Sequence, residues 1–262
     1  MLPEEILEKQ KNTEIAQNQI DEIIKNYWKG NVGLDGIGKI KSYWDKDFDD
    51  IRVSWCLKEP VFRTNDNDEP YSYRERFTEA ADAKGWKNTT FGTIAKTSYG
   101  LIKSFRKGTY IPLSDLLPLT LDGSAPYVYD DGDDLYPLDK IAIINVNKRN
   151  NGSKSDDGFI NAEYAKPDVK KILLQQIDYI EPEIIIVANN VKKMAEDLSG
   201  VKLEEFEEYK FEIPCKFKTL YHYNKETKKL IFFTHHPSMI CTVGGIEPYY
   251  KSIVSTAAKI LL

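Results

Sequence analysis

At residues 184–187 the sequence has the run Ile184-Ile185-Ile186-Val187, in which every side chain is β-branched and apolar. Two similar runs lie upstream and downstream, Ile141-Ala142-Ile143-Ile144 and Leu230-Ile231-Phe232-Phe233. Continuous apolar runs of this length are typical of strands that are covered on both faces, as in a parallel sheet. A more mixed run, Ile51-Arg52-Val53-Ser54-Trp55-Cys56-Leu57, precedes them, so the sequence predicts four strands of one sheet.

The segments that connect these runs carry helical patterns. Apolar residues recur at helical spacing over residues 169–180, after Asp168, which we expect to cap the helix, and before Pro182. Further helices are expected at residues 191–198 and 249–262. A helix between two parallel strands is a crossover unit, so we expect an α/β fold with three layers, α-β-α, around a central four-stranded parallel sheet.

The N-terminal region has a different pattern. Four apolar residues recur there at helical spacing: Ile20, Ile23, Ile24 and Tyr27. Residues 4–28 are therefore expected to form one or two amphipathic helices. We divide the chain into an N-terminal helical extension, residues 1–45, and an α/β domain, residues 46–262.

The composition excludes several classes of protein. The chain has 262 residues, with 36 Lys and Arg against 41 Asp and Glu and a formal net charge of -5, so its surface as a whole does not attract phosphate. The 3 cysteines are far apart, which excludes a disulfide framework, a four-thiolate zinc site and a four-cysteine iron–sulfur cluster. The sequence shows neither a signal peptide nor an apolar stretch approaching the roughly 20 residues that cross a bilayer. We expect a cytoplasmic protein without membrane contacts.

Polar residues follow all four apolar runs. In chain order these residues are Lys58-Glu59-Pro60, Asn145-Val146-Asn147-Lys148-Arg149, Asn189-Asn190 and Thr234-His235-His236-Pro237-Ser238. A parallel sheet binds its ligand beyond the carboxyl ends of its strands. Four polar ends together, with two of the chain's three histidines among them, therefore indicate a site at this edge of the sheet.

Glu59 and His236 are the candidates for chemistry at this edge. Adjacent residues at a strand end point in opposite directions, so we expect one of His235 and His236 to face the site and the two not to share a metal ion. Glu59 is placed to act as a general base or to face a developing cation. The alternatives are a histidine that is hydrogen-bonded in the core and an exposed loop glutamate.

One further stretch resembles a phosphate-binding loop but lacks its chemistry. The string Gly33-Leu34-Asp35-Gly36-Ile37-Gly38-Lys39-Ile40 has Ile40 where a Ser or Thr must bind magnesium, and a helical segment rather than a strand precedes it. We interpret these glycines as a turn.

The strand ends, taken in order, resemble the motifs of the uracil-DNA glycosylase superfamily. Leu57-Lys58-Glu59-Pro60-Val61-Phe62 stands in the place of the first motif, Ile143-Ile144-Asn145 in that of the second, and His236-Pro237-Ser238 in that of the third. The last match is the most specific. The resemblance covers about residues 50–262. It implies that the protein hydrolyses the N-glycosidic bond of a deaminated or damaged base in single- or double-stranded DNA.

The resemblance also implies roles for individual residues. Glu59 and His236 would be catalytic, since the sugar becomes positive and the departing base negative as the bond breaks. Asn145 would read the edge of the flipped base, and Phe62 or Phe91 would supply an aromatic face. Phosphate would be held by four residues, Ser238, Lys148, Arg149 and Lys58. No metal and no cofactor is implied.

Three positions depart from the best-known branch of that superfamily. Leu57 stands where a glycine is usual, Val61 where a tyrosine excludes thymine, and Met239 where a proline follows the third motif. The base that is removed and the loop that enters the duplex are therefore expected to differ from that branch.

Two other functions fit the same residues. One is a non-catalytic protein of the same fold that binds a nucleobase or single-stranded nucleic acid. The other is a hydrolase of a nucleotide or small metabolite, with a metal ion held by Glu59 and His236. Glu59→Gln separates catalysis from binding, and a chelator would inhibit only the metal-dependent hydrolase.

Overall fold

A computed structural model gives the fold. It describes eleven stretches of the chain, residues 2–30, 32–44, 51–58, 71–72, 74, 89–116, 137–149, 157–188, 191–212, 215–239 and 245–262. Within these stretches, none of the helices combines the length and the apolar character that a membrane crossing requires.

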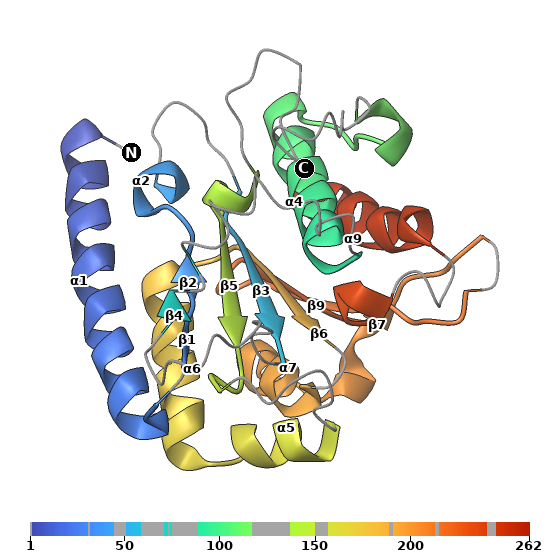
Figure 1. The fold of residues 1–262 in the computed structure, drawn as a ribbon. Coiled ribbons are helices and arrows are strands. Elements are labelled where there is room, and N and C mark those ends of the chain that lie inside the picture. Colours follow the sequence, from blue (N-terminus) through green and yellow to red (C-terminus); the bar gives the residue numbers. More distant parts are fainter. Residues whose placement is uncertain are drawn as a thin grey trace.

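Helices and strands alternate along most of the chain (Figure 1). The helices are α1 (Pro3–Trp28), α2 (Ile40–Tyr43), α4 (Thr89–Lys107), α5 (Asp157–Tyr164), α6 (Pro167–Ile180), α7 (Lys192–Ser199) and α9 (Ile246–Leu261). The strands are β1 (Gly33–Leu34), β2 (Gly36–Ile37), β3 (Val53–Leu57), β4 (Tyr71–Ser72), β5 (Ile141–Asn145), β6 (Ile184–Ala188), β7 (Glu207–Glu208), β8 (Leu220–Asn224) and β9 (Lys229–Thr234). Short 3-10 turns are η2 (Leu113–Asp115), η3 (Pro137–Lys140), η4 (Leu203–Glu205) and η5 (Pro237–Met239).

A mixed sheet of seven strands forms the centre of the described chain, in the order β2-β5-β3-β6-β9-β8-β7. β3 pairs in parallel with β5 and β6, and β6 pairs in parallel with β9. β2 pairs antiparallel with β5, β8 with β9 and β7 with β8. The predicted α/β class is confirmed. The sheet is broader than the four strands expected, because antiparallel strands extend it at both edges.

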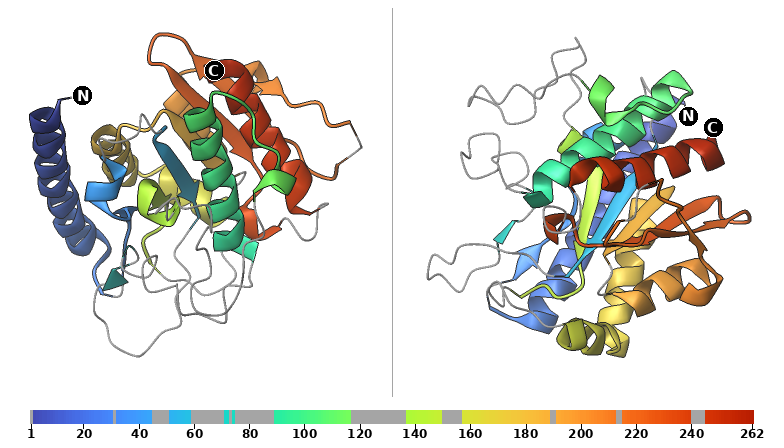
Figure 2. Two further views of the ribbon diagram at one scale, coloured as in Figure 1. Left: turned by 90° about the horizontal axis from the view of Figure 1, so that it is seen from above. Right: turned by 90° about the vertical axis from the view of Figure 1, so that its right-hand side faces the viewer.

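Two hydrophobic clusters cover the two faces of the sheet, since successive residues of a strand point to opposite sides. On one face Trp55 and Ile186 pack with α4 and α9. On the other face Ile144 and Val187 pack with α5, α6 and α7. Figure 2 shows helices on both sides of the sheet. Both faces of the central strands are therefore apolar, which explains their continuous apolar runs.

The N-terminal region shares its core with the rest of the chain. α1 is a single helix, and its Ile20, Ile24 and Trp28 belong to the same cluster as the strand residues on that face. β2 joins the sheet beside β5. The core of the described residues thus continues across the boundary predicted after residue 45.

The glycines of residues 33–38 do not form the turn that we predicted. Gly33 belongs to β1 and Gly36 to β2. Gly36 has a φ of 129°, and a Cβ there would overlap the side chains of Gln17 and Tyr179. The positive φ, which residues with a side chain rarely adopt, is the main reason for a glycine at this position.

α6 begins earlier than the sequence suggested. Lys166 is its N-cap and Pro167 its first residue, so Asp168 lies in the first turn instead of capping the helix. A negative charge in the first turn still interacts favourably with the helix dipole. The helix ends at Ile180, and its C-cap Glu181 takes a left-handed conformation before Pro182.

Candidate functional site

The carboxyl ends of β3 and β6 mark the place where a ligand is expected. β3 leads along the chain to α4 on one face of the sheet, and β6 leads to α7 on the other face. Where the connections after two neighbouring strands run to opposite faces of the sheet, a crevice opens beyond the carboxyl ends of those strands. In Figure 1 this edge of the sheet is at the bottom, where the arrows of β3 and β5 point. Asn189 and Asn190, which follow β6, lie outside the described residues.

The predicted third motif forms a tight turn after β9. Pro237–Met239 is the turn η5, and the backbone N–H of Met239 donates to the carbonyl of His236 at 2.9 Å. The Nδ1 of His236 accepts the backbone N–H of Ser238 at 3.2 Å and lies 2.7 Å from its Oγ. A backbone N–H only donates, so Nδ1 is an acceptor. In the neutral ring the proton is therefore on Nε2, which becomes a hydrogen-bond donor.

Burial keeps the ring of His236 neutral. Burial, together with the smaller effect of the positive charge of Lys58, lowers the pKa of His236 from 6.5 to about 4. Near neutral pH the ring is thus an uncharged donor at Nε2. Such a donor stabilises negative charge that develops on a bound group without first needing a proton from solvent.

His235 has different surroundings. Its ring packs edge-on against Phe217, with ring centroids 5.8 Å apart, and burial lowers the pKa of the imidazole. The hydroxyl of Tyr249 donates to the His235 carbonyl at 3.1 Å. His235 therefore ties the strand end to α9, whereas His236 forms the turn with Ser238.

Three buried hydroxyls fix the end of β9 just before these histidines. Thr219 Oγ1 lies 3.0 Å from Thr234 Oγ1 and 2.8 Å from Ser252 Oγ. Ser252 Oγ in turn donates to the Tyr249 carbonyl at 2.8 Å. This chain of hydrogen bonds connects β9 to α9 and to the residue that precedes β8.

Lys58 carries the positive charge at the end of β3. Its Nζ lies 2.8 Å from Oδ1 of Asp157, the first residue of α5. The side chain of Lys58 is 24% exposed and that of Asp157 is 62% exposed. The charge of Lys58 thus acts on the ring of His236, and its ammonium group is paired with Asp157 of α5.

Asn145 ends β5 and is fully buried. Its backbone N–H and its Nδ2 both donate to Oδ2 of Asp35, at 2.6 and 3.0 Å. Its Oδ1 is buried, and no hydrogen-bond partner for it lies among the described residues. A buried acceptor without a partner costs about 1–3 kcal/mol, so this oxygen favours a ligand or water that donates to it.

Lys148 lies inside the protein instead of at the surface. Its Nζ is 2.7 and 2.9 Å from the two oxygens of Asp35 and 2.8 Å from Oε1 of Gln176, and the side chains of Lys148 and Asp35 have no exposed area. Burial lowers the pKa of Lys148, while the charge of Asp35 raises it. A phosphate contact requires an accessible ammonium group, so this placement does not suit the predicted role.

A second ion pair extends this buried group of charges. The guanidinium of Arg74 pairs with Asp21 of α1 and donates to the Asp35 carbonyl at 3.2 Å. Burial raises the pKa of Asp21, and Arg74 opposes that effect. Asp35 is thus held by Asn145 of β5, by Lys148, by Gln176 of α6 and by Arg74, and Arg74 in turn pairs with Asp21 of α1.

The remaining predicted residues are dispersed. Arg149 is exposed, and its Nε and Nη2 donate to the Trp28 carbonyl at the end of α1. Phe91 lies in α4 and packs partly buried against the core, and Ser238 is exposed beside His236. Glu59 and Phe62 lie outside the described residues. Their predicted roles stay predictions.

Sequence reasoning missed Asp35 and Gln176. Asp35 lies between Leu34 and Gly36 in a glycine-rich stretch that we interpreted as a turn, and Gln176 is a polar residue on the buried face of α6. The only signal in the sequence is this single amide among the apolar positions of the helix. Among the described residues, no three His, Cys, Asp or Glu side chains gather to hold a metal ion.

Comparison with known proteins adds no family. No family model matches the chain. No curated protein matches it significantly.

Proposed function

We propose that this chain hydrolyses the N-glycosidic bond of a deaminated or damaged base in DNA, as a divergent member of the uracil-DNA glycosylase superfamily. The observation that carries the proposal is the neutral ring of His236, whose Nε2 is left as a donor by the turn with Ser238. The fold also supports the proposal, since β5, β3, β6 and β9 pair in parallel within the mixed sheet and helices cover both of its faces.

The chemistry needs two opposite charges to be stabilised. As the bond breaks, electrons pass to the base, whose carbonyl oxygen becomes negative, and the sugar becomes positive. His236 Nε2–H donates to that oxygen, and the charge of Lys58 near the ring adds to the stabilisation. Glu59, which directly follows Lys58 in the sequence, is the predicted general base, which would accept the proton that the attacking water loses.

Asn145 reads the edge of the base in this proposal, which requires the residues that bury its amide to move aside when the base binds. Its Nδ2 is occupied by Asp35, so its Oδ1 is the atom that remains for recognition. An acceptor at this place selects a base that carries a ring N–H, and the base must leave the helical stack to reach it.

The test is cleavage of labelled oligonucleotides that carry uracil, hypoxanthine, xanthine or a thymine mismatch, followed by alkali to break abasic sites. His236→Ala is expected to lower the rate by about 10²–10³-fold, the usual effect of removing one such donor. His222→Ala is the matched control, because His222 lies on β8 and packs near Phe206.

Two outcomes would contradict the proposal. If folded wild-type protein cleaves none of the substrates, the proposed glycosylase activity is wrong. If that protein still binds nucleic acid, the result favours the non-catalytic alternative. Equal rates for wild type and His236→Ala would show that the observed cleavage does not depend on this ring.

A further inference from the structure

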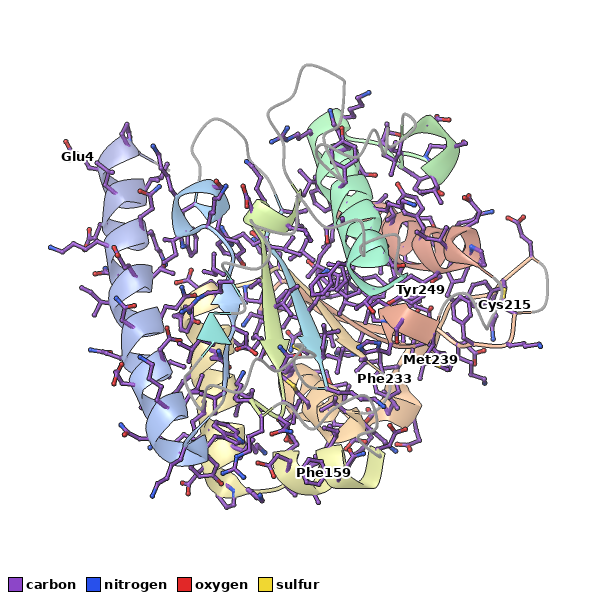
Figure 3. The ribbon with its side chains drawn as sticks, viewed as in Figure 1. Glu4, Phe159, Cys215, Phe233, Met239 and Tyr249 are labelled. Atoms are coloured by element: carbon purple, nitrogen blue, oxygen red, sulfur yellow. The ribbon has the colours of Figure 1, made fainter. Side chains whose placement is uncertain are left out.

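A hollow of about 410 Å³ lies beyond the carboxyl end of β5, between the end of α1, the residues that follow β5, and α5. We call it the aromatic hollow, and the residues that matter here are Tyr27, Trp28, Arg149, Phe159, Glu163 and Lys166. Figure 3 labels Phe159 at the lower end of the molecule, where the arrows of β3 and β5 point. The hollow is connected to the candidate site through α5, which lines the hollow with Phe159 and Glu163 and begins with Asp157, the partner of Lys58.

Two exposed aromatic rings line the aromatic hollow. Phe159 is 43% exposed and Tyr27 is 37% exposed. The Tyr27 ring packs edge-on against Trp28, with centroids 4.7 Å apart, and Trp28 is buried. The exposed ring of Tyr27 therefore packs against the buried ring of Trp28. Exposed aromatic groups beside polar side chains are typical of binding surfaces.

The charges of the aromatic hollow favour an anion. Arg149 is exposed and held in place by the Trp28 carbonyl, and the side chain of Lys166 is 53% exposed. Glu163 is the opposing carboxylate, but it is buried and both of its oxygens are engaged. Its Oε1 accepts Trp28 Nε1–H at 3.2 Å, and its Oε2 pairs with Lys166. Two cations against one satisfied carboxylate make this region locally positive in a chain whose net charge is -5.

We infer that the aromatic hollow binds one unpaired nucleotide of a single-stranded nucleic acid. The base stacks on Phe159 and Tyr27, and the phosphate contacts Arg149 and Lys166. Aromatic stacking combined with cations along the backbone is how proteins hold single strands without reading their sequence. A base within a duplex is stacked between its neighbours and does not present its face to these rings.

This inference rests on the proposed function only in naming nucleic acid as the ligand, since binding in the aromatic hollow needs no cleavage. The hollow would hold a nucleotide that flanks the base bound near His236. It therefore predicts a preference for single-stranded over double-stranded DNA.

The first test measures binding of a fluorescently labelled oligothymidylate by anisotropy. Phe159→Ala is expected to weaken binding by about 5- to 150-fold, the range for loss of one base–aromatic stack. Phe159→Trp keeps an aromatic face and is expected to retain binding. Leu7→Ala is the matched control, because Leu7 is a large apolar residue that is 64% exposed on α1 but does not line the hollow.

The second test measures the dependence of binding on salt. Lys166→Met removes one phosphate contact, so the slope of log affinity against log salt is expected to become shallower by about 0.7. Lys41→Met, an exposed lysine on α2, is the control and leaves the slope unchanged.

The outcomes distinguish this inference from the proposed function. Absence of oligothymidylate binding by wild type, or equal affinity of wild type and Phe159→Ala, overturns the inference, and cleavage of a uracil oligonucleotide would in that case still support the proposed function. Weaker binding by Phe159→Ala, together with no cleavage of any modified base by wild type, supports the hollow and contradicts the proposed function.

Discussion

One carboxylate oxygen of Asp35 fixes Asn145 through two hydrogen bonds. Oδ2 accepts the backbone N–H of Asn145 at 2.6 Å and its Nδ2–H at 3.0 Å. Both oxygens of Asp35 also contact the ammonium group of Lys148. The residue between β1 and β2 therefore orients the amide at the end of β5 and balances a buried charge at the same time.

Asp35→Asn is expected to lower the free energy of unfolding by about 3–5 kcal/mol, because Lys148 would remain buried without a counter-charge. Urea denaturation followed by circular dichroism measures this change. Asp178→Asn is the matched control, since Asp178 is exposed on α6, and a surface substitution of this kind changes stability by less than about 0.5 kcal/mol.

The double substitution Asp35→Asn with Lys148→Met tests the cause. It removes both charges, so much of the lost stability should return. If the double variant is as unstable as Asp35→Asn alone, the loss comes from the broken hydrogen bonds to Asn145 and not from the unpaired charge.

His236 is expected to titrate with a midpoint at a pH of about 4, because burial and the charge of Lys58 lower its pKa from 6.5. An NMR titration of the ring protons measures this value. Since the pKa in the folded state lies below that in the unfolded state, the contribution of His236 to stability is complete above pH 6.5 and is lost as the pH falls toward 4. Cleavage should likewise persist through pH 6.5 and fall near pH 4.

Lys58→Met provides the control for this titration. Removing the positive charge is expected to raise the pKa of His236, although burial still keeps it below 6.5. A midpoint near 6.5 in the wild type would show that the ring is solvated, and the donor role at neutral pH would lose its physical basis.

The sequence predicted those strands that are covered on both faces. All residues of Ile141–Asn145 and of Ile184–Ala188 are buried. Each strand therefore appears in the sequence as a short, nearly continuous apolar run, which is typical of a strand covered on both faces. β2 has two residues, one of them a glycine, and β8 has five half-buried residues in the sequence LYHYN. Neither gives a clear periodic signal, because β2 is only two residues long and β8 is half-buried at every position.

The candidate site was predictable only where its residues are close in the sequence. His236 and Ser238 make their turn within three residues, so the motif itself indicates the contact. Asp35 contacts Asn145, which is 110 residues away in the sequence. The residues next to Asp35 do not distinguish a buried aspartate from one in a surface turn. Lys148 follows a strand in a polar string and was predicted to contact phosphate, and nothing local in the sequence indicates that its side chain is buried against Asp35.

Thr219→Val is expected to lower the free energy of unfolding by about 1–3 kcal/mol, because it removes the hydroxyl that joins Thr234 to Ser252 in a buried place. Urea denaturation measures the loss. Thr227→Val, in the exposed turn between β8 and β9, is the matched control and should change stability by less than about 0.5 kcal/mol. Equal effects of the two substitutions would mean that these hydroxyls do not stabilise the end of β9.

Gly100→Ala in α4 is expected to destabilise the protein, although alanine is the better helix former by about 1 kcal/mol. A Cβ at this position would overlap the phenol ring of Tyr250 in α9, whose hydroxyl donates to the Ile111 carbonyl at 2.6 Å. Overpacking of this kind costs about 1–3 kcal/mol, which exceeds the gain in helix propensity. Thermal or urea unfolding gives the sign directly.

The background of Tyr250→Ala tests whether the ring causes this effect. Without the ring the new methyl group has space, so Gly100→Ala should then be neutral or stabilising by up to about 1 kcal/mol. The sign of the effect should therefore reverse between the two backgrounds, which is the signature of two residues in contact. An identical loss in both backgrounds would show that Gly100 is required for some reason other than the close approach of α4 and α9.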